Sequence, residues 1–454
     1  MQRNEIGNKS EDIVARIERL PQSFWLVQLR LVVGVATFFD AFDALAIAYV
    51  LPVLGRQWNL QPAQVGMAIS IGFAGQLIGA LLAGWWAERH GRLRTMILTV
   101  AAYSITSLLL AAAWSFHALL IFRFIQGIGL GGEVPVAAAY ISEIAKAKGR
   151  GRFILLYELV FPLGLMGAAL AGYFIVPLGW RWMFVLGGFG GLAIFYMQSQ
   201  FPESPRWLAG MGRISEAEAA MKLLEEKIER ETGRPLPAPK PAPRSAQAQK
   251  TRIGELLSSA YWQRTLVIWI MWFSVYLANY SLVTWLPSIY TSIFKLPLQT
   301  ALRYSLGTQA VGFLGTLICA VIIDRLGRRA VVGGSMILGG LVMLAAWRSG
   351  TGIALNLFLV ASAAYLFISA ASLAIYAYTP ELYPTRMRAL GTSTATAWLR
   401  IASIIGPNIV AANLASAGLP RVFLIFSLVA LAGGIIVSIF SKETRERVLE
   451  DVSP

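Results

Sequence analysis

The feature that most constrains this chain is a series of long apolar runs separated by short polar segments. A helix needs about 20 apolar residues to cross the hydrocarbon core of a bilayer, and each run is about that long. We therefore expect an all-α integral membrane protein with twelve transmembrane helices. The runs lie near residues 27–54, 64–87, 95–114, 118–142, 153–176, 180–201, 264–290, 302–324, 330–348, 353–378, 389–414 and 419–441.

The composition supports this interpretation. Hydrophobic residues make up 56% of the chain and charged residues 14%, whereas soluble domains carry about 25% charged residues. The net charge of +15 comes from clusters of Lys and Arg between the apolar runs, which argues against a nucleic-acid partner. If both termini are cytoplasmic, 30 basic residues fall on the inside and 6 on the outside, as the positive-inside rule requires.

Few residues are available for metal or redox chemistry. Cys319 is the only cysteine, and the two histidines, His90 and His117, have no neighbours at metal-ligand spacing. The phosphate-binding pattern GxxxxGK[ST] is absent from the sequence. We therefore expect no metal site, no cofactor, no ATP-driven pump and no enzymatic activity.

One long polar stretch divides the twelve runs into two sets of six. It contains a helical pattern from Ser215 to Arg230 and a proline-rich piece that cannot hold a regular helix. The predicted parts are an N-terminal segment (1–26), a first six-helix bundle (27–201), a linker (202–263), a second six-helix bundle (264–441) and a C-terminal tail (442–454).

Three motifs recur in both halves at offsets of 235 to 238 residues. They are Val50-Leu51-Pro52 with Trp285-Leu286-Pro287, Gly84-x-x-x-Glu88-Arg89-x-Gly91-Arg92 with Ala320-x-x-x-Asp324-Arg325-x-Gly327-Arg328, and Tyr140-x-x-Glu143 with Tyr378-x-x-Glu381. Two parallel repeats of six spans are the organisation described for major facilitator transporters.

Several motifs carry a more specific resemblance. The loops GWWAERHGRLR and AVIIDRLGRR are similar to the major facilitator signature loop. The segments RFIQGIGLGGEVPVAAAYISE, PESPRWL and YTPELYPTRMRALG resemble the branch that contains sugar porters, organic cation and anion transporters, and synaptic-vesicle-like metabolite:proton symporters. The first span, FDAFDALAIAYVLPVL, is most similar to bacterial metabolite:proton symporters of the niacin-transporter type, and also to the Asp-x-x-Asp span of aromatic acid:proton symporters.

The signature loops predict a charge latch at the cytoplasmic ends of the helices. An acid and several arginines can pair between helices there, and glycines permit close helix approach. The residues assigned to this gating latch are Gly84, Glu88, Arg89, Gly91, Arg92, Asp324, Arg325, Gly327, Arg328, Glu143, Arg150, Glu381, Arg386 and Arg388.

Four acids of the first half fall inside predicted spans, where an ionisable side chain costs several kcal/mol unless it is paired or hydrated. Asp40 and Asp43 lie within about 60° on one face of the first span, and both are expected to face the central cavity. Glu133 lies mid-way along the fourth span and Glu158 early in the fifth. Proton coupling is the expected role of this set. Structural pairing is the alternative, and for Glu158 that means a loop arginine.

Arg400 lies near the centre of the eleventh span and is the expected carboxylate clamp. In the resemblance to organic ion transporters, its position is typically Arg in anion carriers and Asp in cation carriers. The alternative is an internal salt bridge to Asp40 or Asp43. Arg123 and Arg30, the other arginines within spans, are expected to extend to the membrane interface as structural residues.

Aromatic residues are expected to line the cavity beside Arg400. Trp272, Tyr276 and Tyr280 recur every four residues and so share one helical face. Trp398 and Tyr376 are further candidates. Helix packing is the alternative for this stripe, while the resemblance to organic ion transporters implies substrate contact.

These inferences lead to one expected function. The resemblance implies a monomeric secondary transporter in a bacterial cytoplasmic membrane that imports a small organic anion together with protons. Nicotinate is the first choice of substrate and a benzoate-like aromatic acid the next. A sugar or polyol porter and a membrane receptor without transport activity are the remaining alternatives.

Overall fold

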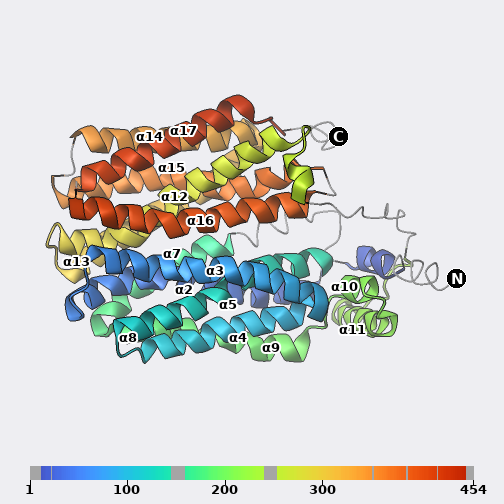
Figure 1. Ribbon diagram of the computed structural model, residues 1–454. Helices are drawn as coiled ribbons and strands as arrows, with labels where there is room; N and C mark the ends of the chain where they lie inside the picture. The colour runs from blue at the N-terminus through green and yellow to red at the C-terminus, as the bar shows by residue number, and fades with distance from the viewer. Residues whose placement is uncertain are drawn as a thin grey trace.

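The computed structural model describes residues 12–21, 23–144, 159–239, 253–349, 352–384, 387–416 and 418–445. Within these ranges the chain is helical and contains no strand (Figure 1). The first half comprises α2 (Phe24–Gln57), α3 (Pro62–His90), α4 (Arg92–Ala111), α5 (Phe116–Ile144), α7 (Val160–Ile175), η1 (Val176–Leu178), α8 (Trp180–Gly188), η2 (Phe189–Gly191) and α9 (Leu192–Gln200). The second half comprises α12 (Trp262–Ser292), α13 (Leu298–Leu326), α14 (Arg328–Ser349), α15 (Ala354–Glu381), α16 (Arg388–Ser416) and α17 (Leu419–Phe440).

Eleven helices in the described residues are long and apolar enough to cross a membrane. The sixth predicted span, 180–201, is instead divided into α8 and α9 by the short 3₁₀ turn η2. The glycine-rich sequence there lowers helix propensity and allows close approach to neighbouring helices. A Cβ atom on Gly187 would lie 1.9 Å from Asp43 Oδ1, and one on Gly190 would lie 2.8 Å from Phe39 Cβ. The segment still packs on α2 and α4, but as two short helices.

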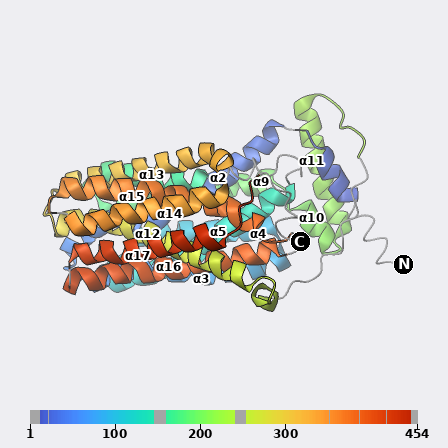
Figure 2. The same ribbon diagram turned by 90° about the horizontal axis from the view of Figure 1, so that it is seen from above.

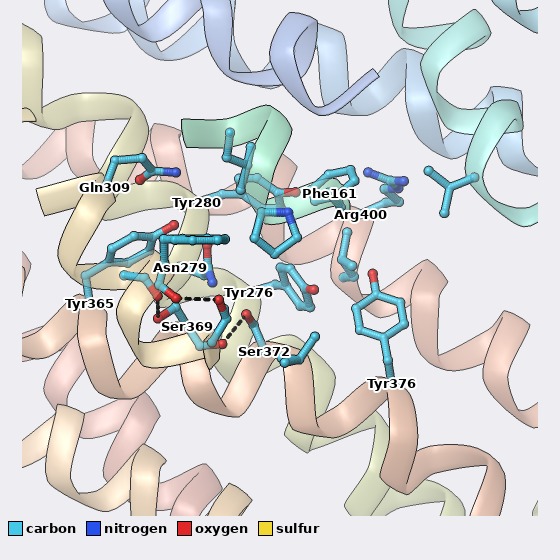
Figure 3. A pocket seen from close by; sticks show the side chains of 18 residues that line it. Phe161, Tyr276, Asn279, Tyr280, Gln309, Tyr365, Ser369, Ser372, Tyr376 and Arg400 are labelled. Carbon is cyan, nitrogen blue, oxygen red and sulfur yellow. Dashed lines mark hydrogen bonds between the residues drawn. The ribbon is translucent and has the colours of Figure 1, made fainter. Parts of the chain in front are cut away.

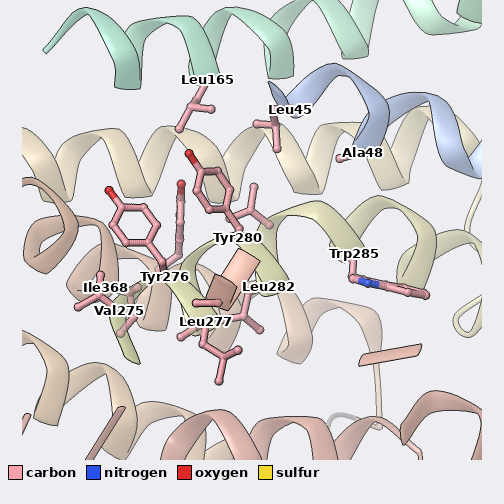
Figure 4. Packing of buried hydrophobic residues seen from close by; sticks show 14 of the residues in the cluster. Leu45, Ala48, Leu165, Val275, Tyr276, Leu277, Tyr280, Leu282, Trp285 and Ile368 are labelled. Atoms are coloured by element: carbon pink, nitrogen blue, oxygen red, sulfur yellow. The ribbon is translucent and has the colours of Figure 1, made fainter. Parts of the chain in front are cut away.

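The two halves pack against each other through three helix pairs: α2 with α12, α3 with α16, and α7 with α13. Since α2 and α12 are the first helices of the two halves, this pairing follows the internal repeat. Figure 4 shows part of the α2–α12 contact, where Leu45 and Ala48 face the residues of α12 near Tyr280. Buried apolar residues on both sides make this interface continuous.

The halves are joined mainly at the end of the bundle opposite the chain termini, here called the distal end. The apolar core of the second half continues into the first half only through residues within 41–54, 65–73, 110–119 and 165–184. First-half residues nearer the terminal end form a core of their own, within which the described second half contributes no residue. Within the described residues, the apolar contact between the two halves therefore lies towards the distal end.

Two linker helices, α10 (Pro205–Gly210) and α11 (Ile214–Thr232), lie at the terminal end beside a short helix over residues 12–19 (Figure 2). The helix expected over 215–230 is α11. Glu225 accepts hydrogen bonds from Arg16 Nε at 3.0 Å and from Arg19 Nη2 at 2.6 Å. Glu231 accepts the backbone N–H groups of Phe24 and Trp25, the latter at 2.8 Å. The linker helices are thus tied to the start of α2. The only other described helical turn of the linker is η3 (Ile253–Leu257).

Candidate substrate pocket

A pocket lies between the two halves, near the middle of the bundle (Figure 3). The first half contributes one residue of α5 and three of α7, and the second half contributes residues of α12, α13, α15 and α16. Most of the surface therefore belongs to the second half. The lining residues are Val134, Phe161, Pro162, Leu165, Tyr276, Asn279, Tyr280, Gln309, Gly312, Phe313, Thr316, Tyr365, Ser369, Ser372, Leu373, Tyr376, Leu399 and Arg400.

Tyrosine rings form one wall of this pocket. Tyr276 and Tyr280 stand one turn apart on α12, and their rings stack with a centroid distance of 5.5 Å and an interplanar angle of 27°. Tyr376 of α15 also lines the pocket. Trp272 continues the stack, 5.8 Å from Tyr276, but it is absent from the lining because its Nε1 donates to Thr379 Oγ1 at 2.8 Å. The prediction that Trp272 contacts the cavity is therefore wrong for this structure.

Trp398 also lies outside the lining, although it is only two residues from Arg400. Its ring packs against Trp269 and Phe273 of α12, at centroid distances of 5.6 and 6.1 Å. Two residues along a helix correspond to about 200° of rotation, so Trp398 and Arg400 face nearly opposite directions. The sequence prediction for Trp398 is corrected accordingly.

Arg400 is the only charged residue among those that line the pocket. Its Nη1 donates a hydrogen bond to Oε1 of Gln76, a residue of α3 in the other half. Gln76 is only 2% exposed and lies where α3 and α5 approach backbone to backbone. A Cβ on Gly131 would lie 2.0 Å from the Gln76 carbonyl oxygen. The partner of Arg400 is thus a neutral amide, held in a tightly packed position.

No ion pair joins Arg400 to an acid within the part of the chain that the structure describes. The expected alternative, a direct salt bridge to Asp40 or Asp43, is therefore absent there. Asp40 does lie within electrostatic range of Arg400. It is 3% exposed and does not line the pocket.

Asp43 points into the first-half bundle and not into the pocket. Its Oδ1 accepts a hydrogen bond from Ser107 Oγ of α4 at 3.0 Å, and the same oxygen packs against Gly187 of α8. The expectation that both aspartates face the central cavity is therefore wrong for Asp43. Helical rotation places Asp40 and Asp43 close together on α2. The close approach of α8 and α4 places the Asp43 carboxylate inside the first half.

Arg123 does not extend to the membrane interface, contrary to the sequence prediction. Its side chain is 1% exposed, and Nη1 donates to the Asp43 backbone carbonyl at 3.1 Å and to Gln126 Oε1 at 2.7 Å. Gly72 of α3 makes room for the guanidinium, since a Cβ there would lie 2.7 Å from Arg123 Nη2. Arg123 and Asp43 are thus neighbouring opposite charges in the first half. Arg30 is partly exposed and donates to Leu26 O at 3.2 Å.

Glu133 of α5 is fully buried, and Thr37 Oγ1 of α2 lies 3.0 Å from its Oε1. It faces α2, while the adjacent Val134 lines the pocket. Three other predicted site residues, Glu158, Arg150 and Arg386, lie outside the described residues.

The repeated signature loops form matching charge clusters at the terminal end. In the first half, Arg92 contacts Glu88 at 2.9 Å and Glu143 at 3.0 Å. In the second half, Arg328 contacts Asp324 at 2.8 Å and Glu381 at 3.2 Å. Each cluster ties the end of one span to the helix that follows it and to a third helix.

The remaining latch residues divide into two groups. Gly91 and Gly327 have φ values of 109° and 93°, a region that favours glycine. Gly84, Arg89, Arg325 and Arg388 take no part in the acid contacts that the described residues form. A Cβ on Gly84 would meet open space, Arg89 lies over the Trp85 ring, the Arg325 carbonyl accepts from Arg445, and Arg388 Nε donates to Tyr383 O at 3.1 Å. Among the described residues, only part of the predicted latch therefore takes part in the acid contacts.

A family model described as "Sugar (and other) transporter" matches residues 31–454. The chain belongs to this family of major facilitator transporters. It is 35% identical over 443 residues to the niacin transporter NiaP of Acinetobacter baylyi, covering 97% of this chain and 99% of that protein. It is 28% identical over 472 residues to the synaptic vesicle 2-related protein of Xenopus laevis, covering 99% of this chain and 84% of that protein.

Solved structures agree on the fold. The xylose transporter XylE from E. coli, in a partially occluded inward open conformation, matches with a TM-score of 0.70 and 18% identity, covering 92% of this chain and all of that one. At that identity the likeness shows the major facilitator fold alone. The predicted family is thus confirmed, and the protein is a multi-pass membrane transporter and not an enzyme.

Two carboxylates of this major facilitator transporter were not predicted from its sequence. Glu203 accepts the backbone N–H groups of Arg92 and Leu93 at 2.8 and 3.0 Å, at the start of α4. Glu443 accepts those of Arg328 and Arg329 at 3.0 and 3.1 Å, at the start of α14. Each acid satisfies free donors at a helix N-terminus. They lie 240 residues apart, close to the offsets of 235 to 238 residues between the repeated motifs, and this would have been the signal in the sequence.

Proposed function

We propose that this transporter imports a small organic carboxylate by proton-coupled symport, with nicotinate as the first choice. The observation that carries the proposal is the position of Arg400 as the one charged side chain among the pocket-lining residues. A guanidinium binds a carboxylate through two parallel hydrogen bonds. Its hydrogen-bond partner Gln76 is neutral, so this contact leaves the guanidinium charge available to an anion. The name of the Acinetobacter baylyi relative, a niacin transporter, agrees with this choice.

The shape of the lining supports a planar substrate. The stacked rings of Tyr276 and Tyr280 offer aromatic faces beside Arg400, and a ring placed against them gains about 0.5 to 1.5 kcal/mol beyond its area burial. Benzoate-like acids fit the same description and are the near rival. A neutral sugar or polyol would leave the charge of Arg400 without an anionic partner, which makes it the weaker candidate.

Buried acids of the first half are the proposed proton carriers. The Asp43 carboxylate accepts a hydrogen bond from Ser107, and Arg123, which donates to the Asp43 backbone carbonyl, is its electrostatic neighbour. Asp40 lies within electrostatic range of Arg400, and Glu133 contacts Thr37. We favour Asp43, because the neighbouring Arg123 guanidinium stabilises its charged form. A conformational change that moves Arg123 would then change the proton affinity of Asp43. Access would alternate by rocking of the two halves, with the Arg92 and Arg328 clusters acting as a gating latch on the cytoplasmic side.

The direct test of the substrate class is calorimetric titration of the purified protein with nicotinate, benzoate, xylose and an organic cation. We expect binding of the two carboxylates only. Arg400→Lys keeps the charge but loses the planar fork, so carboxylate affinity should fall at least about tenfold. Arg421→Lys, at an exposed position of α17, is the matched control. Unchanged affinity in Arg400→Lys would remove the clamp from the proposal.

A further inference from the structure

The pocket contains two buried amides that the carboxylate clamp does not use. Gln309 of α13 is 3% exposed and Asn279 of α12 is 5% exposed, and both line the pocket. In Figure 3 they lie towards one side of the pocket and Arg400 towards the other, with the ring of Tyr276 between. The pocket therefore has two polar regions separated by an aromatic one.

The amides differ from the hydroxyl groups around them. Ser369 Oγ donates to Gly312 O at 2.7 Å, Ser372 Oγ to Ser369 O at 2.8 Å, and Thr316 Oγ1 to Phe313 O at 2.7 Å. These hydroxyls are therefore engaged by carbonyl groups of the helices themselves. By contrast, Gln309 contacts the Tyr365 hydroxyl, but its Oε1 is buried and accepts no hydrogen bond among the described residues.

Asn279 is the second amide of the pocket. It stands between Tyr276 and Tyr280 on α12, and no hydrogen bond of its side chain occurs within the described part of the chain. A buried polar group without a partner costs about 1 to 3 kcal/mol, and native structures rarely keep one unless water or a ligand satisfies it. Gln309 Oε1 is such a group, and Asn279 lines the same pocket, so the two amides point to a ligand group that hydrogen-bonds there.

We infer that Gln309 and Asn279 form a second binding subsite, which recognises a hydrogen-bonding atom of the substrate ring away from the carboxylate. This inference rests on the proposed function, since it needs a carboxylate held at Arg400. A side-chain amide offers both donors and an acceptor, so the subsite accepts a ring nitrogen or a ring hydroxyl. It narrows the substrate class from aromatic carboxylates in general to those that carry a second polar group, such as nicotinate.

The test compares three carboxylates in calorimetric titrations of the full-length protein. Nicotinate has a ring nitrogen remote from the carboxylate, picolinate has its nitrogen beside the carboxylate, and benzoate has none. One neutral hydrogen bond corresponds to about a threefold to tenfold change in affinity. Nicotinate should therefore bind about threefold to tenfold more tightly than benzoate, and picolinate should show no such advantage.

Variants then locate the effect. Gln309→Met and Asn279→Leu should each reduce the preference for nicotinate while leaving benzoate affinity within about twofold. Gln299→Met is the matched control, because Gln299 is an amide of the same helix α13 at an exposed position outside the pocket lining, and it should leave the preference unchanged. Thermal unfolding of each variant checks that it is folded, and the two amide variants test the subsite separately.

Each outcome bears on a different claim. If wild-type protein binds the three acids equally, or if both amide variants weaken nicotinate and benzoate to the same degree, the subsite is wrong while the carboxylate proposal stands. If picolinate gains as much as nicotinate, the nitrogen acts through ring electronics, and the subsite is again wrong. If no carboxylate binds, the proposed function fails and the subsite fails with it.

Discussion

Arg400 donates a hydrogen bond to Gln76 across the interface between the two halves. This contact joins α16 to α3 at the edge of the pocket, and it holds the guanidinium without cancelling its charge. A carboxylate in place of the amide would form an ion pair at that point, in a region shielded from water where charges interact strongly.

We therefore expect Gln76→Glu to weaken carboxylate binding at least about tenfold, or roughly 1.4 kcal/mol. Calorimetric titration with benzoate measures the effect. Gln299→Glu, which introduces the same charge at an exposed position of α13, should leave the affinity near that of wild type. Tight benzoate binding by Gln76→Glu would mean that the charge of Arg400 does not attract the substrate.

The fold and part of the pocket could be predicted from the sequence, because they depend on patterns within single helices. Apolar run length gave the spans, and the spacing of four residues gave the common face of Tyr276 and Tyr280. The same spacing included Trp272, whose indole instead bonds to Thr379 of another helix. Helical periodicity gives the direction of a side chain but not the helix that it meets.

Long-range contacts account for the other differences. Gln76 is 324 residues from Arg400, and Arg123 is 80 residues from Asp43. Whether Arg123 extends to the interface or turns inward depends on the space left by Gly72, which lies on a different helix. The break in the sixth span likewise occurs at glycines where helices approach closely. An average hydropathy over the span does not detect such glycines.

Asp43→Asn should separate binding from proton coupling. The amide keeps the size of the side chain and can still accept from Ser107, but it cannot carry a proton. In proteoliposomes we expect exchange of labelled for unlabelled nicotinate to remain largely intact, while accumulation driven by a pH gradient is lost. Asp40→Asn and Glu133→Gln are tested beside it. Gradient-driven uptake at the wild-type level in Asp43→Asn would assign the proton to another residue.

The contact between α11 and the helix over residues 12–19 should depend on pH. Burial alone would raise the pKa of Glu225, but hydrogen bonds from Arg16 and Arg19 outweigh burial and hold its pKa below the usual 4.5. A carboxylate with a pKa that is lower in the folded state stabilises that state above the unfolded pKa. This stabilisation should be full at neutral pH and should disappear as the pH falls below about 4.5.

Glu225→Gln should therefore loosen residues 12–19 at pH 7, with a loss of about 1 kcal/mol of local stability for a partly exposed charged contact. Hydrogen exchange of this segment measures the change. Glu226→Gln is the control, because Glu226 contacts only Lys222 and Arg230 of its own helix among the described ion pairs. Equal protection in the Glu225→Gln variant and in wild type would show that the ion pairs do not hold the segment.

Uptake of labelled nicotinate into proteoliposomes of the purified wild-type protein tests the transport proposal most directly. With the outside more acidic than the inside, we predict accumulation above the external concentration and collapse of that accumulation when a protonophore is added. We also predict initial uptake about fivefold or more slower in Arg400→Lys at substrate levels near the wild-type half-saturation. Nicotinate that only equilibrates across the membrane, or that enters at a rate indifferent to the pH gradient, would contradict proton-coupled carboxylate import.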